Sequence, residues 1–88
     1  MAQPADGETR RSRKARTVPY QPRYDKFLSK LIKAREEAGL TQRDVAEQLG
    51  MFHSWISKTE SGDRRLDVME LMLLAELYGK PPSYLLED

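Results

Sequence analysis

The sequence predicts an all-α fold of five helices, preceded by a basic N-terminal arm. From Tyr24 onward, apolar residues recur with the three- and four-residue spacing of amphipathic helices. Glycines at positions 39, 50, 62 and 79 divide this region into helix-length segments, and glycine readily takes the left-handed conformation that ends a helix. No segment alternates between apolar and polar residues as a half-buried strand does. At 88 residues, the chain is sized for a single domain.

Residues 1–23 differ in composition from the rest of the chain. They hold six basic and two acidic residues (net +4), whereas residues 24–88 hold nine basic and twelve acidic residues (net −3). They also contain three prolines and few large apolar side chains, so they cannot bury enough surface to offset the entropy of ordering. We therefore expect a disordered basic arm over 1–23 and a folded domain over 24–88. The arm is either a solvated tail or a segment that follows a DNA backbone or enters a minor groove. Its composition alone also permits a nuclear-localisation signal.

The first helix is expected over residues 24–38 and ends before Gly39. One face of this helix carries Phe27, Leu28, Leu31, Ile32 and Arg35. A charged residue on an apolar stripe is unusual unless it is paired. The position of Arg35 therefore predicts a carboxylate partner supplied by another part of the fold.

Two shorter helices are expected on either side of Gly50. Thr41 is a good N-cap, and Asp44 sits three residues later, where a carboxylate meets the positive end of a helix. Met51 and Ile56 continue the apolar pattern after the glycine, which predicts a second helix over about residues 53–60. Helices this short are not stable alone, so they must pack against one another and against the rest of the domain.

The last two helices follow similar start signals. Asp67 is a capping residue with Glu70 three positions later, and this helix ends at Gly79. Pro82 is placed at the first turn of a final short helix. Its apolar residues are Tyr84, Leu85 and Leu86.

The stretch from Gln42 to Glu60, QRDVAEQLGMFHSWISKTE, reads as two short helices joined by a tight turn. Ala46 is small where the two helices cross, and the apolar residues Val45, Leu49, Met51 and Ile56 are expected to fix the angle between them. This arrangement presents the second helix as a protruding rod. An α-helix has the width that enters the DNA major groove.

Residues 28–86 resemble the phage-repressor/Cro (Xre-type) helix-turn-helix family. The resemblance rests on "LIKAREEAGLTQ", "DVAEQLG", "ISKTESG" and "LDVMELMLLAELYG", and it covers about two-thirds of the chain. It implies a five-helix repressor-like bundle that binds double-stranded DNA in a sequence-specific manner as a transcriptional regulator, acting as a repressor. It also implies a homodimer on a two-fold symmetric operator. We expect the dimer contacts to come from Tyr84, Leu85 and Leu86.

The resemblance also implies roles for individual residues. Gln42 is expected to bind a phosphate at a helix N-terminus, and His53, Ser54 and Lys58 are expected to meet base edges. Trp55 either donates its indole N–H to a sugar-phosphate strand or covers an apolar seam between helices. For each of these positions the alternative is an ordinary surface or packing role. The predicted DNA-binding set is Gln42, Arg43, Phe52, His53, Ser54, Trp55, Ser57, Lys58, Arg64 and Arg65.

The resemblance names Glu60 as the carboxylate partner of Arg35, in a structural ion pair that orients the second short helix. Two positions depart from the family pattern. Phe52 stands at the N-cap, where serine or threonine is common, and it cannot accept the free backbone N–H bonds. Thr59 stands where a larger apolar residue is usual.

Other classes of function have little support in the sequence. The chain has no cysteine and one histidine, His53, whose neighbour Ser54 points about 100° away on a helix. We therefore expect no enzyme activity, no metal, no cofactor and no small-molecule ligand. No apolar run approaches a membrane span and no signal peptide is evident, so we expect a cytoplasmic, nucleoid-associated protein. The main alternative is an antitoxin or adaptor that uses the same fold to bind a protein partner through Trp55, Phe52 and Tyr84.

Overall fold

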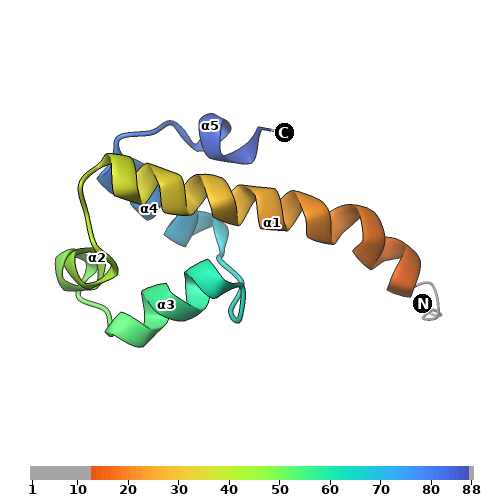
Figure 1. The fold of residues 1–88 in the computed structure, drawn as a ribbon, viewed down its shortest axis with the longest axis horizontal. Coiled ribbons are helices and arrows are strands. Elements are labelled where there is room, and N and C mark those ends of the chain that lie inside the picture. Colours follow the sequence, from red (N-terminus) through yellow and green to blue (C-terminus); the bar gives the residue numbers. More distant parts are fainter. Residues whose placement is uncertain (1–12, 88) are drawn as a thin grey trace.

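Five helices make up the part of the chain that the structure describes (Figure 1). The computed structural model describes residues 13–87, with side chains from residue 21 onward. No strand occurs within these residues, so the all-α prediction is confirmed. The helices are α1 (Arg13–Glu37), α2 (Gln42–Leu49), α3 (His53–Ser61), α4 (Val68–Tyr78) and α5 (Pro82–Leu86).

Helix α1 begins earlier than the sequence predicts. The expected start was Tyr24, but the helix starts at Arg13 and runs through Pro19 and Pro22. The start was placed after these prolines because the helical spacing of apolar residues begins at Tyr24. In the structure α1 continues past both of them, so residues 13–23 of the predicted arm belong to this helix. Residues 1–12 of the predicted arm lie outside the described residues.

Helices α2 and α4 begin with the capping residues that the sequence predicts. The Asp44 backbone N–H donates to Thr41 Oγ1 at 3.0 Å, and the Thr41 N–H donates to the Asp44 carboxylate at 2.9 Å. Asp67 and Glu70 exchange the same pair of bonds at 2.8 and 3.0 Å. Each capping box satisfies two backbone donors that a helix start would otherwise leave free.

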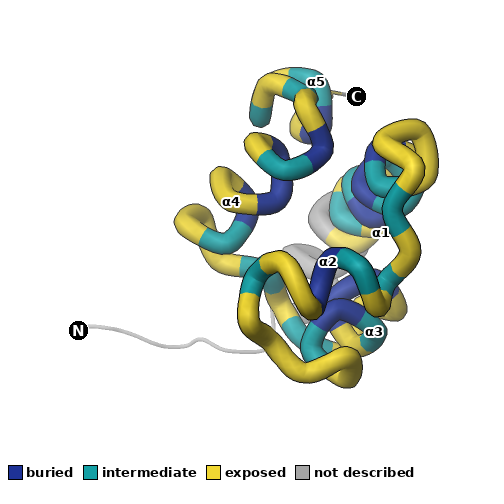
Figure 2. Tube along the Cα trace, turned by 90° about the vertical axis from the view of Figure 1, so that its left-hand side faces the viewer, coloured by how far each residue is buried: buried dark blue, intermediate teal, exposed yellow. Residues whose placement is uncertain are grey.

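The core lies where α1, the α2–α3 pair and α4 meet (Figure 2). Its members at zero or near-zero exposure come from every described helix, so the four short helices and α1 stabilise one another. Met51, expected in this core, is 40% exposed and contributes its backbone N–H to Ala46 O instead. The fully buried apolar residues are Leu31, Ala34, Val45, Ile56, Leu74 and Leu85.

Candidate nucleic-acid interface

A tight turn at Gly50 joins α2 to α3. Gly50 has φ 69°, a left-handed conformation that glycine adopts without steric cost, and its N–H closes α2 onto Ala46 and Glu47 carbonyls. Gly62 ends α3 in the same way, with φ 88°. Helices α2 and α3 pack directly on each other, which confirms the predicted helix-turn-helix geometry.

Helix α3 has a buried face and an exposed face. Ile56 and Glu60, four residues apart, are buried against the domain. Ser54 and Lys58 are exposed on the other side and His53 is exposed at the N-terminal end, and nothing else in the described chain covers them. Ser57 is half-buried at the edge between the faces. The exposed side of α3 is therefore open to a partner along its length.

Phe52 is the N-cap of α3 and makes no side-chain capping bond, as its chemistry requires. Its side chain is 86% exposed and therefore adds little to the packing of the domain. The N-terminal end of α3 thus combines an apolar surface with free hydrogen-bond donors.

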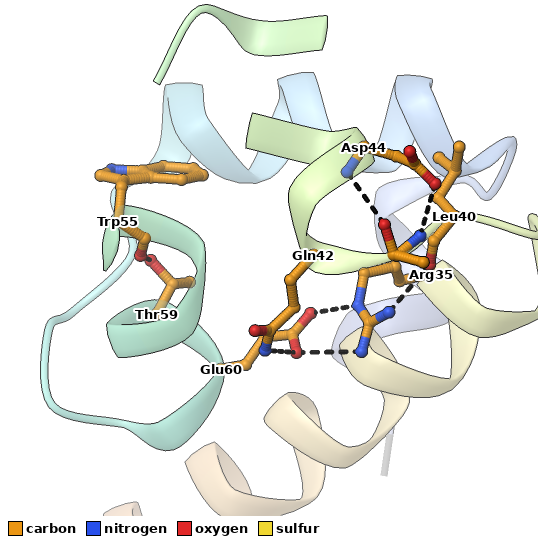
Figure 3. Close-up of polar contacts among 8 residues, drawn as sticks. Arg35, Leu40, Gln42, Asp44, Trp55, Thr59 and Glu60 are labelled. Atoms are coloured by element: carbon orange, nitrogen blue, oxygen red, sulfur yellow. Dashed lines mark hydrogen bonds and ion pairs between the residues drawn. The ribbon is translucent and has the colours of Figure 1, made fainter. Parts of the chain in front are cut away.

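The C-terminal end of α3 is held by the predicted ion pair (Figure 3). Arg35 Nε donates to Glu60 Oε2 at 2.7 Å and Arg35 Nη2 to Glu60 Oε1 at 3.2 Å. The two side chains are 12% and 4% exposed. Arg35 Nη1 also donates to the Leu40 carbonyl at 2.8 Å, so the guanidinium is bonded on three sides. The hydrogen bond to Glu60 raises the pKa of Arg35 above its ordinary value.

Gln42 joins the same carboxylate. Its Nε2 donates to Glu60 Oε1 at 2.9 Å, and the side chain is half-buried at the start of α2 (Figure 3). An amide nitrogen has two hydrogens, so one remains after this bond. Gln42 was predicted to bind a phosphate, and its bond to Glu60 was not predicted. The bond fixes the orientation of the amide relative to α3.

Trp55 covers a seam between helices, which was one of its two predicted roles. Its ring is half-buried against the core, and Nε1 is buried with no hydrogen-bond partner among the described residues. The Arg64 guanidinium lies 5.2 Å from the ring centroid. In the other predicted role the indole N–H donates to a DNA strand; Nε1 is buried in this conformation, and a contact of Trp55 with DNA stays a prediction.

Thr59 has a structural reason to replace a larger apolar residue. It is fully buried, its hydroxyl donates to the Trp55 carbonyl at 2.7 Å, and it accepts from Arg64 Nη1 at 3.2 Å. A leucine here would leave that arginine nitrogen with one partner fewer. Thr59 thus couples Trp55 to the loop that follows α3.

Arg64 forms a second ion pair, with Glu70. Nη1 and Nη2 donate to the two carboxylate oxygens at 3.1 and 3.0 Å, and the side chains are 32% and 22% exposed. The hydrogen bond from Arg64 is the main reason why the pKa of Glu70 lies below its ordinary value. Arg64 was predicted to contact DNA, and its pair with Glu70 was not predicted, since no local spacing relates a loop arginine to a capping glutamate. Its contact with DNA stays a prediction.

The remaining predicted cations lie apart from one another. Arg43 is exposed on the first turn of α2. Arg65 lies over the Tyr24 ring at 4.2 Å and donates to Gln21 Oε1 at 3.2 Å, so it ties the α3–α4 loop to α1. Arg65 therefore has intramolecular contacts that the sequence analysis did not foresee.

Two other kinds of feature are absent from residues 13–87. No group of three histidine or acidic side chains in this range could hold a metal ion. None of the helices within these residues is long and apolar enough to cross a membrane.

Comparison with known proteins agrees with this geometry. Residues 30–85, more than half of the chain, match a family model described as a helix-turn-helix domain. The solved structure of an XRE-family-like protein from Pseudomonas syringae pv. tomato str. DC3000 is 41% identical, with a TM-score of 0.73. The match covers 80% of this chain and 88% of that chain. The chain belongs to the Xre-type helix-turn-helix family. No curated protein matches it.

This Xre-type domain does not expose all of the residues that were expected to form a dimer. Leu85 is fully buried in the core of its own chain. Tyr84 is half-buried, with Lys30 Nζ 5.4 Å and Lys80 Nζ 4.9 Å from its ring centroid. Leu86 alone of the three is freely exposed, at 60%. The dimer contact predicted for Leu85 is therefore wrong, because its side chain is buried in its own chain, whereas the contacts predicted for Tyr84 and Leu86 stay a prediction.

Proposed function

We propose that this protein is a sequence-specific regulator of transcription that binds double-stranded DNA, acts as a repressor and places α3 in the major groove. The observation that carries the proposal is the exposed face of a helix whose opposite face is fixed. His53, Ser54 and Lys58 are open to solvent, while Glu60 is held by two other helices. A helix presented in this way meets base edges without first having to become ordered.

Each exposed side chain of α3 has a suitable chemistry for reading bases. Lys58 is a cation that reaches the O6 or N7 acceptors of guanine, and Ser54, four residues earlier on the same face, donates or accepts. Phe52 supplies an apolar contact for a thymine methyl group at the start of the helix. His53 and Ser57, themselves four residues apart, lie together on one side of this row and complete the proposed reading surface.

The helix before α3 supplies the contact to the DNA backbone. Gln42 and Arg43 occupy the first turn of α2, where the backbone N–H groups and the helix dipole favour a phosphate. The second amide hydrogen of Gln42 and the exposed guanidinium of Arg43 are the side-chain donors. Arg65 and Arg64, on the loop after α3, remain proposed backbone contacts. The protein would act in the cytoplasm, at the nucleoid.

The proposal is tested by measuring duplex binding as a function of salt, after selecting preferred sequences from a random duplex pool. We expect log Kd to rise linearly with log salt, with a slope of about 0.9 for each phosphate neutralised. An absence of duplex binding even at low salt would contradict the proposal and favour an adaptor or antitoxin that binds a protein.

The reading surface is tested with the double variant Lys58→Ala plus Ser54→Ala. We expect affinity for the selected site to fall by at least ten-fold and affinity for random duplex to fall much less, because base contacts are worth about 1–3 kcal/mol each. Lys33→Ala, an exposed lysine on α1, is the matched control and should change neither. Equal losses on both duplexes would assign Lys58 and Ser54 to the DNA backbone.

A further inference from the structure

Arg64, on the loop after α3, lies beside the proposed reading surface, but its side chain is bound within its own chain. Its backbone N–H donates to the Lys58 carbonyl at 3.2 Å, so the loop folds back onto the helix that carries this surface. The guanidinium contacts three other groups, which are the Glu70 carboxylate, the Thr59 hydroxyl and the Trp55 ring. A cation close to the proposed DNA interface is therefore already neutralised by the protein itself.

The ion pair between Arg64 and Glu70 is of a kind that exchanges partners readily. Its two hydrogen bonds measure 3.1 and 3.0 Å, and both side chains are partly exposed. A pair this exposed adds little stability, because solvent screens the two charges. A phosphate offers a guanidinium the same bidentate geometry as a carboxylate does. Arg64 can therefore exchange Glu70 for a phosphate at a small cost.

The indole of Trp55 provides a second donor for the carboxylate that Arg64 would leave. Trp55 Nε1 is buried and has no hydrogen-bond partner among the described residues, which is costly for a polar group. The pKa of Glu70 is lowered mainly by Arg64 and to a lesser extent by Trp55, so the indole N–H lies near this carboxylate. Glu70 Oε1 already accepts from Arg64 and from the Asp67 N–H, so it has no room for a third donor. The departure of Arg64 would free an acceptor position on each carboxylate oxygen.

The other bonds around Arg64 do not depend on its side chain. Thr59 Oγ1 donates to the Trp55 carbonyl at 2.7 Å, and this bond remains when the arginine leaves (Figure 3). The capping box at the start of α4 also remains, because Glu70 and Asp67 exchange their two bonds without Arg64. The departure of Arg64 therefore changes the partners of Glu70 without disturbing the helices on either side.

We propose that Arg64 leaves Glu70 for a phosphate when the protein binds a duplex, and that Trp55 Nε1 then donates to Glu70. Glu70 is thus an internal competitor of the DNA backbone, and it lowers the affinity of the protein for a duplex. The step that involves DNA rests on the proposed function. The replacement of Arg64 by Trp55 at Glu70 is a property of the chain alone and is tested without DNA.

The first experiment follows the indole N–H of the full chain by proton–nitrogen NMR. The chain has one tryptophan, so this group gives a single signal. Arg64→Ala imitates the departure of the arginine, and we expect the signal to move downfield, because Nε1 then donates to a carboxylate. The double variant Arg64→Ala plus Glu70→Gln is the control, since it also lacks the arginine. Its signal should move less, because an amide oxygen is a weaker acceptor than a carboxylate.

The second experiment measures binding to the duplex selected from the random pool. Glu70→Gln keeps an acceptor for the Asp67 N–H but cannot form an ion pair, and we expect it to bind about two- to five-fold more tightly. This gain should vanish when Arg64→Ala is added. Asp63→Asn removes the same charge from an exposed position on the same loop, so any gain that it causes should be equal with and without Arg64. Addition of the duplex to the unchanged chain should also move the indole signal downfield.

The outcomes separate the possible failures. An indole signal that stays in place in Arg64→Ala would overturn the proposal, whether or not the protein binds DNA. Weaker duplex binding by Glu70→Gln, or a gain that persists without Arg64, would show that Arg64 stays on Glu70 in the complex and would also overturn it. If the signal moves in Arg64→Ala but no variant binds a duplex, the replacement of Arg64 by Trp55 is supported, and the proposed function and the step to DNA are contradicted.

Discussion

The two ends of α3 are stabilised in opposite ways. At the C-terminal end, Glu60 accepts hydrogen bonds from Arg35 and Gln42, while Thr59 is buried and bonded to Trp55 and Arg64. At the N-terminal end, Phe52 makes no capping bond and is almost fully exposed. The end that has internal partners sets the direction of the helix. The N-terminal end lacks such partners, and it is the end that we propose meets DNA. Contacts with DNA there would supply the stabilisation that a capping side chain gives to other helices.

The largest expected effect comes from removing the buried carboxylate. Glu60→Ala leaves Arg35 charged, buried and unpaired, which we expect to cost about 3–5 kcal/mol of unfolding free energy. Urea unfolding followed by circular dichroism measures this loss. The double variant Arg35→Met plus Glu60→Leu should lose less than Glu60→Ala alone, because no lone charge remains. Strictly additive losses would show that the two residues do not act as a pair.

A smaller effect is expected at the second ion pair of the same end. Arg64→Ala should cost about 1 kcal/mol, because the Arg64–Glu70 pair is partly exposed and solvent screens it. A double-mutant cycle with Glu70→Ala should give a coupling energy of about 0.5–1 kcal/mol. A coupling near zero would mean that the pair does not help to fix the loop after α3.

A substitution at the N-terminal end of α3 should change the unfolding free energy in the opposite direction. Phe52→Ser introduces a capping hydroxyl where none exists, and we expect it to stabilise the domain by about 1 kcal/mol. Thr41→Ala, which removes the working cap of α2, is the matched control and should destabilise by a similar amount. If Phe52 contacts DNA as proposed, Phe52→Ser should also lower the affinity for the selected site. A variant that gains stability and keeps full affinity would remove Phe52 from the reading surface.

The smallest effect is a dependence of stability on acid. The pKa of Asp44 is lowered mainly by the Thr41 backbone N–H, and the pKa of Glu70 is lowered mainly by Arg64. A carboxyl group with a lowered folded-state pKa contributes stability above its ordinary pKa and loses it as pH falls through the lowered value. We expect the urea concentration at the unfolding midpoint to decrease as the pH is lowered below about 4–5, the ordinary pKa range of these carboxyl groups. Glu70→Gln should make this fall shallower, and an unchanged fall would show that Glu70 contributes nothing to it.

Local chemistry accounts for the parts of the fold that the sequence predicted correctly. Thr41 with Asp44 and Asp67 with Glu70 set two helix starts, and Gly50 and Gly62 end two helices where expected. These signals act within a few residues of chain and are visible without a fold. The start of α1 was missed because residues 1–23 carry few large apolar side chains and the helical spacing of apolar residues begins only at Tyr24.

The errors at the site involve contacts between distant parts of the chain. Leu85 was placed on the surface because a five-residue helix gives no clear periodicity, yet packing on α1 and α4 buries it completely. Two roles were predicted for Trp55, packing between helices and donation to a DNA strand. Its packing became visible only from the position of Arg64 and the burial of Nε1. The pairing of Arg35 with Glu60 was an exception: a charge on an apolar stripe signals a partner, and the family resemblance supplied its identity.

The bond between Gln42 and Glu60 links two tasks that are usually considered separately. If Gln42 binds a phosphate while α3 lies in the major groove, the side chain that contacts the DNA backbone is bonded to Glu60 of the helix that contacts the bases. Neither can shift without moving the other. A duplex whose groove width displaces the phosphate would therefore also shift α3 relative to the base edges. The protein would then respond to the shape of the DNA through residues that touch no base.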